Sequence, residues 1–172
     1  MRLHIGGNER REGWTVFDAR PGPHIDIVGD CTRMTAIADN SVEEVYASHV
    51  LEHFGYDSDM PLVLREILRV LTPGGRFMVS VPDLGNLCWL FLMPNFSIEE
   101  RYSVTRVMFG GQKHELDLHK SGLNHELLGA ALNDVGFTAI RRVEGFGLFD
   151  DSSVLMLFGV PISLNMEARK PG

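Results

Sequence analysis

The sequence lacks a hydrophobic run long enough to cross a membrane. Its longest strongly apolar run, LCWLFLM at residues 87–93, is far shorter than the roughly 20 residues that a membrane-spanning helix needs. No signal-like apolar block follows Arg2 at the start of the chain. These two absences predict a cytoplasmic protein without a membrane partner.

Cysteine and positive charge are also scarce. Cys31 and Cys88 lie far apart without Cys-x-x-Cys spacing, which argues against a disulfide framework and a zinc knuckle. Sixteen Lys and Arg residues against 23 Asp and Glu residues give a net charge of −7. This charge opposes binding to nucleic acids and to anionic membranes, so a small-molecule partner is favoured.

The start of the chain lacks two features of a dinucleotide-binding domain. The pattern G-x-G-x-x-G is absent, and only residues 6–13 separate the first strand-like segment from the second. A parallel crossover generally needs about a dozen residues or more, so we expect a loop without a helix N-terminus for a diphosphate. This argues against NAD or FAD and permits a cofactor without phosphates. One sheet face would be less covered, and Trp14, Phe17 or a partner subunit in a homodimer would cover it.

The hydrophobic pattern predicts one α/β domain over residues 1–172. Five segments of the first half have the alternation or the β-branched runs of strands: residues 2–5, 14–19, 24–28, 43–50 and 76–82. Leu64, Ile67 and Leu68 have helical spacing in DMPLVLREILRVL, and the turn TPGG follows. We therefore expect a Rossmann-like, mostly parallel, twisted sheet with helices on both faces and a shortened or missing first crossover helix.

The second half is less regular at first. Residues 84–125 contain short helical segments interrupted by Pro94, and we interpret them as a substrate-covering insertion. A helix closed by Gly136 is predicted over residues 125–137. Strands are predicted at residues 138–146, 153–160 and 162–170, of which the last two would pair as an antiparallel C-terminal edge.

Small, polar or acidic residues follow each of the five predicted strands. Ligands of open parallel sheets bind outside the carboxyl ends of the strands, so these residues would share one cleft. Each alone is explained by a turn or a solvated cap, but their joint placement favours a binding site. The residues at these ends are Gly6, Gly7, Asp18, Asp30, Ser48, His49 and Asp83.

Each of these residue types suits part of a nucleoside ligand. Gly6 and Gly7 lack Cβ and permit close approach of the backbone, while Asn8 tolerates a left-handed conformation. The carboxylate of Asp18 can accept hydrogen bonds from vicinal ribose hydroxyls, and Asp30 can accept one from an exocyclic amine such as that of adenine.

Several motifs together resemble the type 11-like branch of the class I S-adenosylmethionine (SAM)-dependent methyltransferases. The resemblance covers about residues 2–85 and is most specific in YASHVLEHF and LREILRVLTPGGRFMVSVPD. It implies SAM as the cofactor, with Gly6 and Gly7 near the methionine moiety, Asp18 at the ribose, Asp30 and Cys31 at the adenine, and Ser48 and His49 beside the sulfonium. The turn Gly6-Gly7-Asn8 departs from the G-x-G that is usual in the family, which puts the strength of SAM binding in question.

The resemblance implies methyl transfer to an O, N or C nucleophile of a small molecule or a sugar-containing metabolite. Histidine is the natural base for such a nucleophile, and we favour His53 and His119 over His49 and His114, with a packing role for each equally open. A catalytically inactive SAM-binding or regulatory partner subunit is the alternative.

A metal-dependent hydrolase that uses Gln112, His114, Glu115, Asp117 and His119 is a third hypothesis. His114 and His119 are five positions apart, which separates them on a helix and points them to opposite faces of a strand. We therefore predict no metal site.

Overall fold

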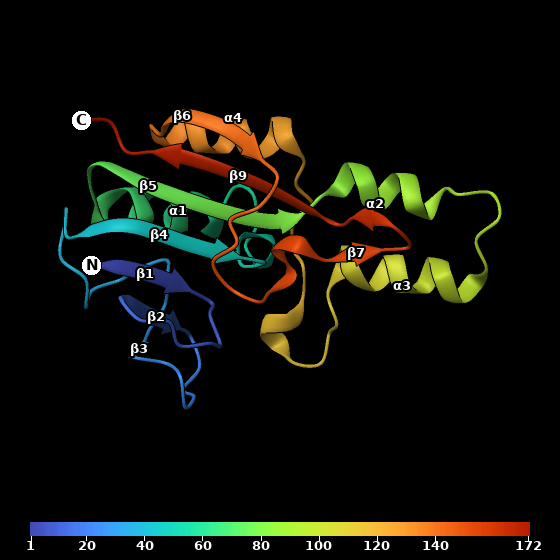
Figure 1. Cartoon of the computed structure of the whole chain (residues 1–172), viewed down its shortest axis with the longest axis horizontal. Coiled ribbons are helices and arrows are strands. Elements are labelled where there is room, and N and C mark those ends of the chain that lie inside the picture. Colours follow the sequence, from blue (N-terminus) through green and yellow to red (C-terminus); the bar gives the residue numbers. More distant parts are fainter.

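A computed structural model describes all residues, 1–172. Its main feature is a sheet of seven strands in the order β3-β2-β1-β4-β5-β9-β6 (Figure 1). β1 to β5 run parallel, whereas β9 is antiparallel to both β5 and β6. The mostly parallel, Rossmann-like sheet with antiparallel pairing by the C-terminal strand is confirmed. The bounds are β1 (Arg2–Ile5), β2 (Trp14–Asp18), β3 (Ile27–Val28), β4 (Val42–Ser48), β5 (Leu71–Pro82), β6 (Thr138–Val143) and β9 (Ser163–Arg169).

The pairing predicted for the last two strands is wrong. β9 does not pair with residues 153–160; it inserts between β5 and β6, where Leu164, Met166 and Ala168 are fully buried. β7 (Met156–Leu157) and β8 (Val160–Pro161) instead form a separate two-stranded sheet. Residues 163–168 are buried on both faces of β9, which fits its interior position, because an edge strand would also leave its backbone groups unpaired on one side.

Two amphipathic helices cover one face of the sheet. α1 (Asp59–Val70) and α4 (His125–Val135) contact each other, and their apolar side chains join those of the strands in a core of 27 buried residues. Val63, Leu64 and Ile67 of α1 are fully or almost fully buried, as their helical spacing predicts. α4 ends at Gly136, whose φ of 108° is the left-handed conformation that glycine adopts readily.

The opposite face has no α-helix, and its only helical element is the 3-10 helix η3 (Ser152–Val154), whereas helices were expected on both faces. Residues 6–13 form a loop, which confirms the missing first crossover helix. The segment 144–154 covers this face instead, where Phe149 packs with Trp14, Tyr46 and Met78. Trp14 thus lies on the face where we expected it, whereas Phe17 packs into the larger core on the other side. The short connections between the first strands leave no room for helices, so cover comes from a distant part of the chain.

A helical hairpin extends beyond the carboxyl ends of the strands (Figure 1). It consists of α2 (Leu84–Phe91) and α3 (Ile98–Phe109), with Pro94 between them. The Asp83 carboxylate accepts hydrogen bonds from the first turn of α2, and Ser97 and Glu100 form a capping box at α3.

The remaining helices are three short 3-10 helices: η1 (Leu51–His53), η2 (Glu115–Asp117) and η3 (Ser152–Val154). None of the helices has the length and apolar character needed to span a membrane.

The helix-free face contains a buried histidine that makes stability sensitive to acid. His4 is 4% exposed, and its ring lies 4.0 Å from that of Phe149 and 5.1 Å from that of Tyr46. Its Nδ1 has no hydrogen-bond partner. Burial lowers the pKa of His4 to about 4, against a smaller opposing effect of Asp151. The folded protein therefore holds this imidazole neutral.

We expect the His4→Leu variant to lose less stability in mild acid than the wild type. Below pH 6.5, the ordinary pKa, the imidazole binds a proton in the unfolded chain, whereas folded His4 stays neutral down to about pH 4. The contribution of neutral His4 to the free energy of unfolding is therefore complete above pH 6.5 and falls as the pH drops towards 4. Between pH 7 and pH 5 the wild type should lose about 2 kcal/mol more of its free energy of unfolding than His4→Leu does. Urea unfolding at both pH values measures it. Equal acid sensitivity of the two proteins would contradict the assignment.

Candidate active site

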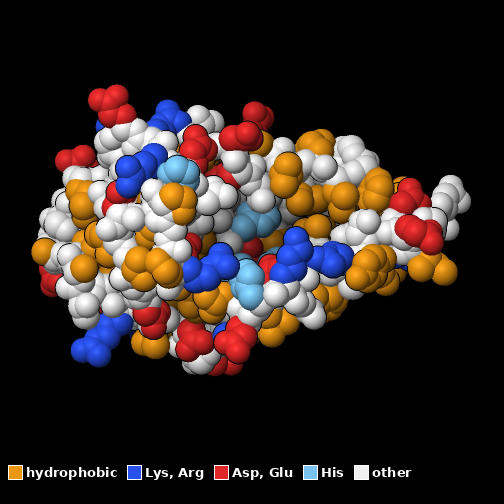
Figure 2. Space-filling view, turned by 90° about the horizontal axis from the view of Figure 1, so that it is seen from below, with side chains coloured by type: hydrophobic (Ala, Val, Ile, Leu, Met, Phe, Trp, Pro, Cys, Tyr) orange, Lys and Arg blue, Asp and Glu red, His pale blue; other side chains and the backbone are white.

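A cavity of about 650 Å³ opens at the carboxyl ends of the first four strands. Asp18 from the end of β2, Asp30 after β3 and His49 after β4 line it together. Figure 2 shows histidine and basic side chains around the hollow on this side of the molecule. Residues 114–118 and Lys120 form the opposite wall, so part of the predicted covering segment does border the cavity. The strand ends therefore converge as parallel topology requires.

Asp18 and Asp30 each keep one carboxylate oxygen free of protein partners. Oδ1 of Asp18 accepts from the backbone N–H of Arg20 at 2.7 Å, and Oδ1 of Asp30 accepts from that of Thr32 at 2.8 Å. These bonds hold both carboxylates in position while Oδ2 of each makes no hydrogen bond within the protein. Cys31 lies beside them, and burial raises the pKa of its thiol to about 12, so it stays neutral. Two fixed acceptors thus share one cavity.

A second hollow of about 390 Å³ adjoins the first, and Gly6 lines both. Gly7, Asn8 and Ser48 line only the second hollow, so the predicted cofactor residues divide between two adjacent spaces. Glycine is required sterically at both turn positions. A Cβ on Gly6, which has φ of +71°, would lie 2.5 Å from Cγ2 of Val50, and one on Gly7 would lie 2.4 Å from Nδ1 of His4.

The second hollow also contains a residue that the sequence did not single out. Asp151 lines it, and its Oδ2 accepts a hydrogen bond from the Tyr46 hydroxyl at 2.6 Å. No motif marks Asp151, which reaches the site because segment 144–154 crosses the helix-free face. Asp83, by contrast, lies at the fifth strand end but lines neither hollow, because it caps α2 and pairs with Arg142.

His49 is held in an unusual backbone conformation at the end of β4. Its φ of 54° is in the left-handed region, which is uncommon for a residue with a side chain. Nε2 lies 2.8 Å from Oγ of Ser163, and that hydroxyl donates its hydrogen to the carbonyl of Ser152 at 2.7 Å. Nε2 of His49 is therefore the nitrogen that carries the proton. Burial lowers the pKa of His49 to about 4, so the ring is neutral.

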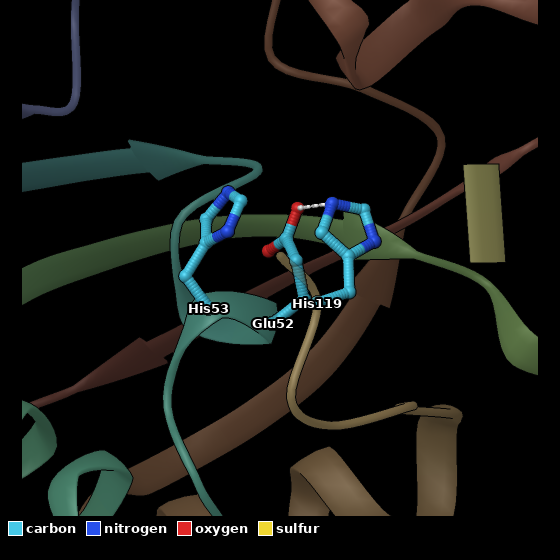
Figure 3. A group of neighbouring side chains, drawn as sticks. All are labelled: Glu52, His53 and His119. Atoms are coloured by element: carbon cyan, nitrogen blue, oxygen red, sulfur yellow. Dashed lines mark ion pairs between the residues drawn. The ribbon is translucent and has the colours of Figure 1, made fainter. Parts of the chain in front are cut away.

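The two histidines favoured as bases meet, although they are distant in sequence. The rings of His53 and His119 lie edge to face with centroids 4.9 Å apart, and Glu52 lies between their ring edges (Figure 3). Burial lowers the pKa of both histidines and raises that of Glu52 to about 8. His53 also lines the larger cavity, whereas His119 does not. Glu52 was missed from the sequence, although it stands inside the motif YASHVLEHF.

The metal group considered for residues 112–119 is not formed. His114 contacts Arg20 at 2.9 Å, while Asp117 accepts from the backbone N–H groups of Gly111 and Lys113 within its own turn. His119 faces the other way, towards His53. The loop thus presents its polar groups to different partners.

The sheet order, the cavity at the strand ends and the free carboxylates define an α/β cofactor-binding fold. Residues 14–79 match a family model described as a methyltransferase domain. Over this part of the chain the sequence resembles methyltransferase domains, and the fold of the whole chain is that of class I SAM-dependent methyltransferases. The cofactor of the family is SAM, and the two hollows with their glycine turn and free carboxylates fit its polar and apolar parts.

Solved structures support the same fold at low sequence identity. A SAM-dependent methyltransferase from Archaeoglobus fulgidus has 15% identity and a TM-score of 0.60, over 98% of this chain and 85% of that one. One from Mesorhizobium loti has 20% identity and a TM-score of 0.59, over 98% and 89%. A Haloferax volcanii structure with the Trm112 methyltransferase activator has 15% identity and a TM-score of 0.57, over 99% and 82%. The curated proteins give no match.

Proposed function

We propose that the protein is an active methyltransferase that transfers a methyl group from SAM to a nucleophile of a small molecule or a sugar-containing metabolite. The observation that carries this proposal is the meeting of Asp18, Asp30 and His49 in one cavity of about 650 Å³. The first two residues offer free acceptors for a nucleoside, and the third stands where two hollows adjoin. We further propose a cytoplasmic location and no nucleic-acid or membrane partner, on the grounds of charge and composition.

The proposed cofactor contacts follow the two hollows. Asp18 would bind the ribose hydroxyls, and Asp30 with Cys31 would bind the adenine, all in the larger cavity. Gly6 borders both spaces, and Gly7, Asn8 and Ser48 would bind the methionine moiety in the smaller one. His49, with its neutral ring, would stand beside the sulfur. SAM itself supplies an activated methyl group, so the protein has to orient the acceptor and remove its proton.

The acceptor side of the cavity carries the groups that would handle that proton. His53 lines the cavity and contacts His119, and burial holds the pKa of both below the ordinary value. Both rings are therefore neutral at pH 7 and able to bind a proton or a Lewis acid. We propose that these two histidines act on the acceptor.

Calorimetric titration with SAM tests the proposal, followed by transfer of a labelled methyl group to a panel of hydroxylated and amino-bearing small molecules. We expect saturable binding of one SAM per chain and label in at least one class of acceptor. Absence of both heat and a thermal shift at millimolar SAM would refute the cofactor assignment. Binding without transfer to any acceptor, including cell extract, would refute only the enzymatic part.

The second candidate is a SAM-binding partner subunit without catalysis. Exposed apolar side chains on the helical hairpin favour it, because Leu92 and Ile98 are 73% and 80% exposed. The turn Gly6-Gly7-Asn8, which departs from the usual family pattern, favours it as well. A homodimer through the same hairpin is also proposed, and sedimentation at high concentration distinguishes it from a monomer.

A further inference from the structure

Glu52 is a buried carboxylate without a hydrogen-bond donor. Its side chain is 2% exposed, and neither Oε1 nor Oε2 makes a hydrogen bond. Burying such a group costs free energy unless a proton, a donor or a cation compensates it. Two histidine nitrogens lie within 4.0 Å of Oε1: Nδ1 of His49 at 3.5 Å and Nε2 of His119 at 3.9 Å.

The outer contacts of the three histidines determine which nitrogen of each is free. Nδ1 of His53 lies 3.1 Å from the carbonyl of Leu118, and Nδ1 of His119 lies 3.3 Å from that of Met108. A carbonyl only accepts, so each of these nitrogens donates and carries the proton. His49 donates through Nε2 to Ser163, as described above. The nitrogens left with a lone pair are Nε2 of His53, Nε2 of His119 and Nδ1 of His49.

The atoms at the centre of this cluster are therefore all hydrogen-bond acceptors: the Glu52 carboxylate oxygens and one ring nitrogen with a lone pair from each histidine. No N–H or O–H group donates a hydrogen bond to the Glu52 oxygens. One ligand atom each from Glu52, His53 and His119 lie within 4.8 Å of one another. A proton on Glu52 would provide a single donor and leave the other lone pairs unsatisfied. A cation at the centre would satisfy all of them. Histidines that donate their outer nitrogen to a carbonyl or hydroxyl and direct the inner one at a common point have the arrangement of metal ligands.

We propose that Glu52, His53 and His119 (Figure 3) bind one divalent transition-metal ion. His49, whose Nδ1 lies 3.5 Å from the Glu52 carboxylate, would be a fourth ligand. Two imidazoles and a carboxylate suit zinc, manganese, iron(II) or cobalt(II) rather than calcium. Ligands about 2.1 Å from a tetrahedral ion lie about 3.4 Å apart, so side-chain movements of about 1 Å close the site. His49 and His53 line the larger cavity, which leaves a path for the ion and for a further ligand.

The role of the ion rests on the proposed function. Bound beside the cavity, the ion would expand to five-coordinate, take a hydroxyl of the acceptor as its fifth ligand and lower the pKa of that hydroxyl. The O–H bond would then break, the proton would pass to water in the cavity, and the oxygen would keep the electron pair with which it attacks the methyl carbon. As the O–C bond forms, the C–S bond of the sulfonium would break, and its electron pair would stay on the sulfur of the departing S-adenosylhomocysteine. This deepens the proposal in one respect: the acceptor would be an alcohol or a sugar hydroxyl. His53 and His119 would then act on the acceptor through the ion and not as free bases.

Metal content tests the site without reference to methyl transfer. The full-length protein is stripped with a chelator, dialysed against Zn²⁺ or Co²⁺ and analysed for metal, and its affinity is measured by titration. We expect one ion per chain. Glu52→Gln and His119→Asn are expected to weaken binding by at least about 100-fold, the upper end of what the loss of an outer-shell partner costs. His24→Asn, an exposed histidine outside the cluster, is the matched control and should bind like the wild type.

The outcomes separate the two proposals. A stripped wild type that takes up no ion, or variants that bind as tightly as the wild type while remaining folded by circular dichroism, would overturn the metal site. One ion per chain together with complete absence of methyl transfer would keep the metal site and refute the enzymatic function. Methyl transfer at an unchanged rate in stripped protein would refute the role of the ion and keep the methyltransferase assignment.

Discussion

Replacing Asp18 by alanine is expected to lower the affinity for SAM by about 10- to 150-fold. The carboxylate stands in the larger cavity with Oδ2 free of protein partners, while Oδ1 is held by the backbone N–H of Arg20. A hydrogen bond to a charged group contributes about 1.5 to 3 kcal/mol, and 1.4 kcal/mol corresponds to a factor of ten. Titration calorimetry of both proteins with SAM measures the change.

Two further variants distinguish ligand binding from local structure. Asp18→Asn retains an oxygen that can accept from the Arg20 N–H but lacks the charge, so its affinity should lie between those of Asp18→Ala and the wild type. Asp134→Ala removes an exposed carboxylate of α4, outside both hollows, and should bind SAM like the wild type. If Asp18→Ala bound SAM normally, the ribose assignment would fail, and with it the reason for placing the nucleoside in the larger cavity.

The parallel half of the fold could be predicted because its signals are local. Each strand of the first half has its own alternation or buried run, and the last residues of parallel strands share one sheet edge. The sequence alone therefore places Asp18, Asp30 and His49 together. The position of the C-terminal strand could not be predicted, because its alternation of apolar Leu164, Met166 and Ala168 with polar residues suits an edge strand as well as an interior one. Its place was decided by pairing with β5, about 90 residues earlier in the chain.

Glu52 shows why part of the candidate site escaped prediction. It stands in a three-residue 3-10 helix next to His53, where an acidic side chain is ordinarily solvated. Burial comes from the distant segment around residue 120, whose Lys120 and Ser121 N–H groups donate to the Glu52 carbonyl at 2.7 and 3.1 Å. The same closure brings His119 against His53. Sequence spacing identified both histidines but had no means of showing that they meet across a carboxylate.

Replacing Phe149 by alanine is expected to destabilise the protein by about 3 kcal/mol or more. Phe149 is 9% exposed, stacks on Tyr46 at 5.3 Å and meets Trp14 edge to face at 5.3 Å. It is the buried aromatic by which segment 144–154 attaches to the helix-free face, and its removal leaves a cavity against His4. Urea unfolding measures the loss. Phe109→Ala, at a position that is 53% exposed on α3, should change stability by only about 0.5 kcal/mol.

The same substitution should also weaken SAM binding, because the segment is a wall of the smaller hollow. Phe149, Asp150, Asp151 and Ser152 face Gly7 and Asn8 across that space. If segment 144–154 replaces the absent crossover helix, its loosening removes support from the glycine turn and lowers affinity even where the protein remains folded. Normal SAM affinity in a destabilised Phe149→Ala protein would show that the methionine moiety does not use the smaller hollow. Asp18 lines only the larger cavity, and Phe149 lines only the smaller hollow. If Phe149→Ala weakens SAM binding, the free-energy losses of Asp18→Ala and Phe149→Ala should therefore add, as expected for separate contacts to one ligand.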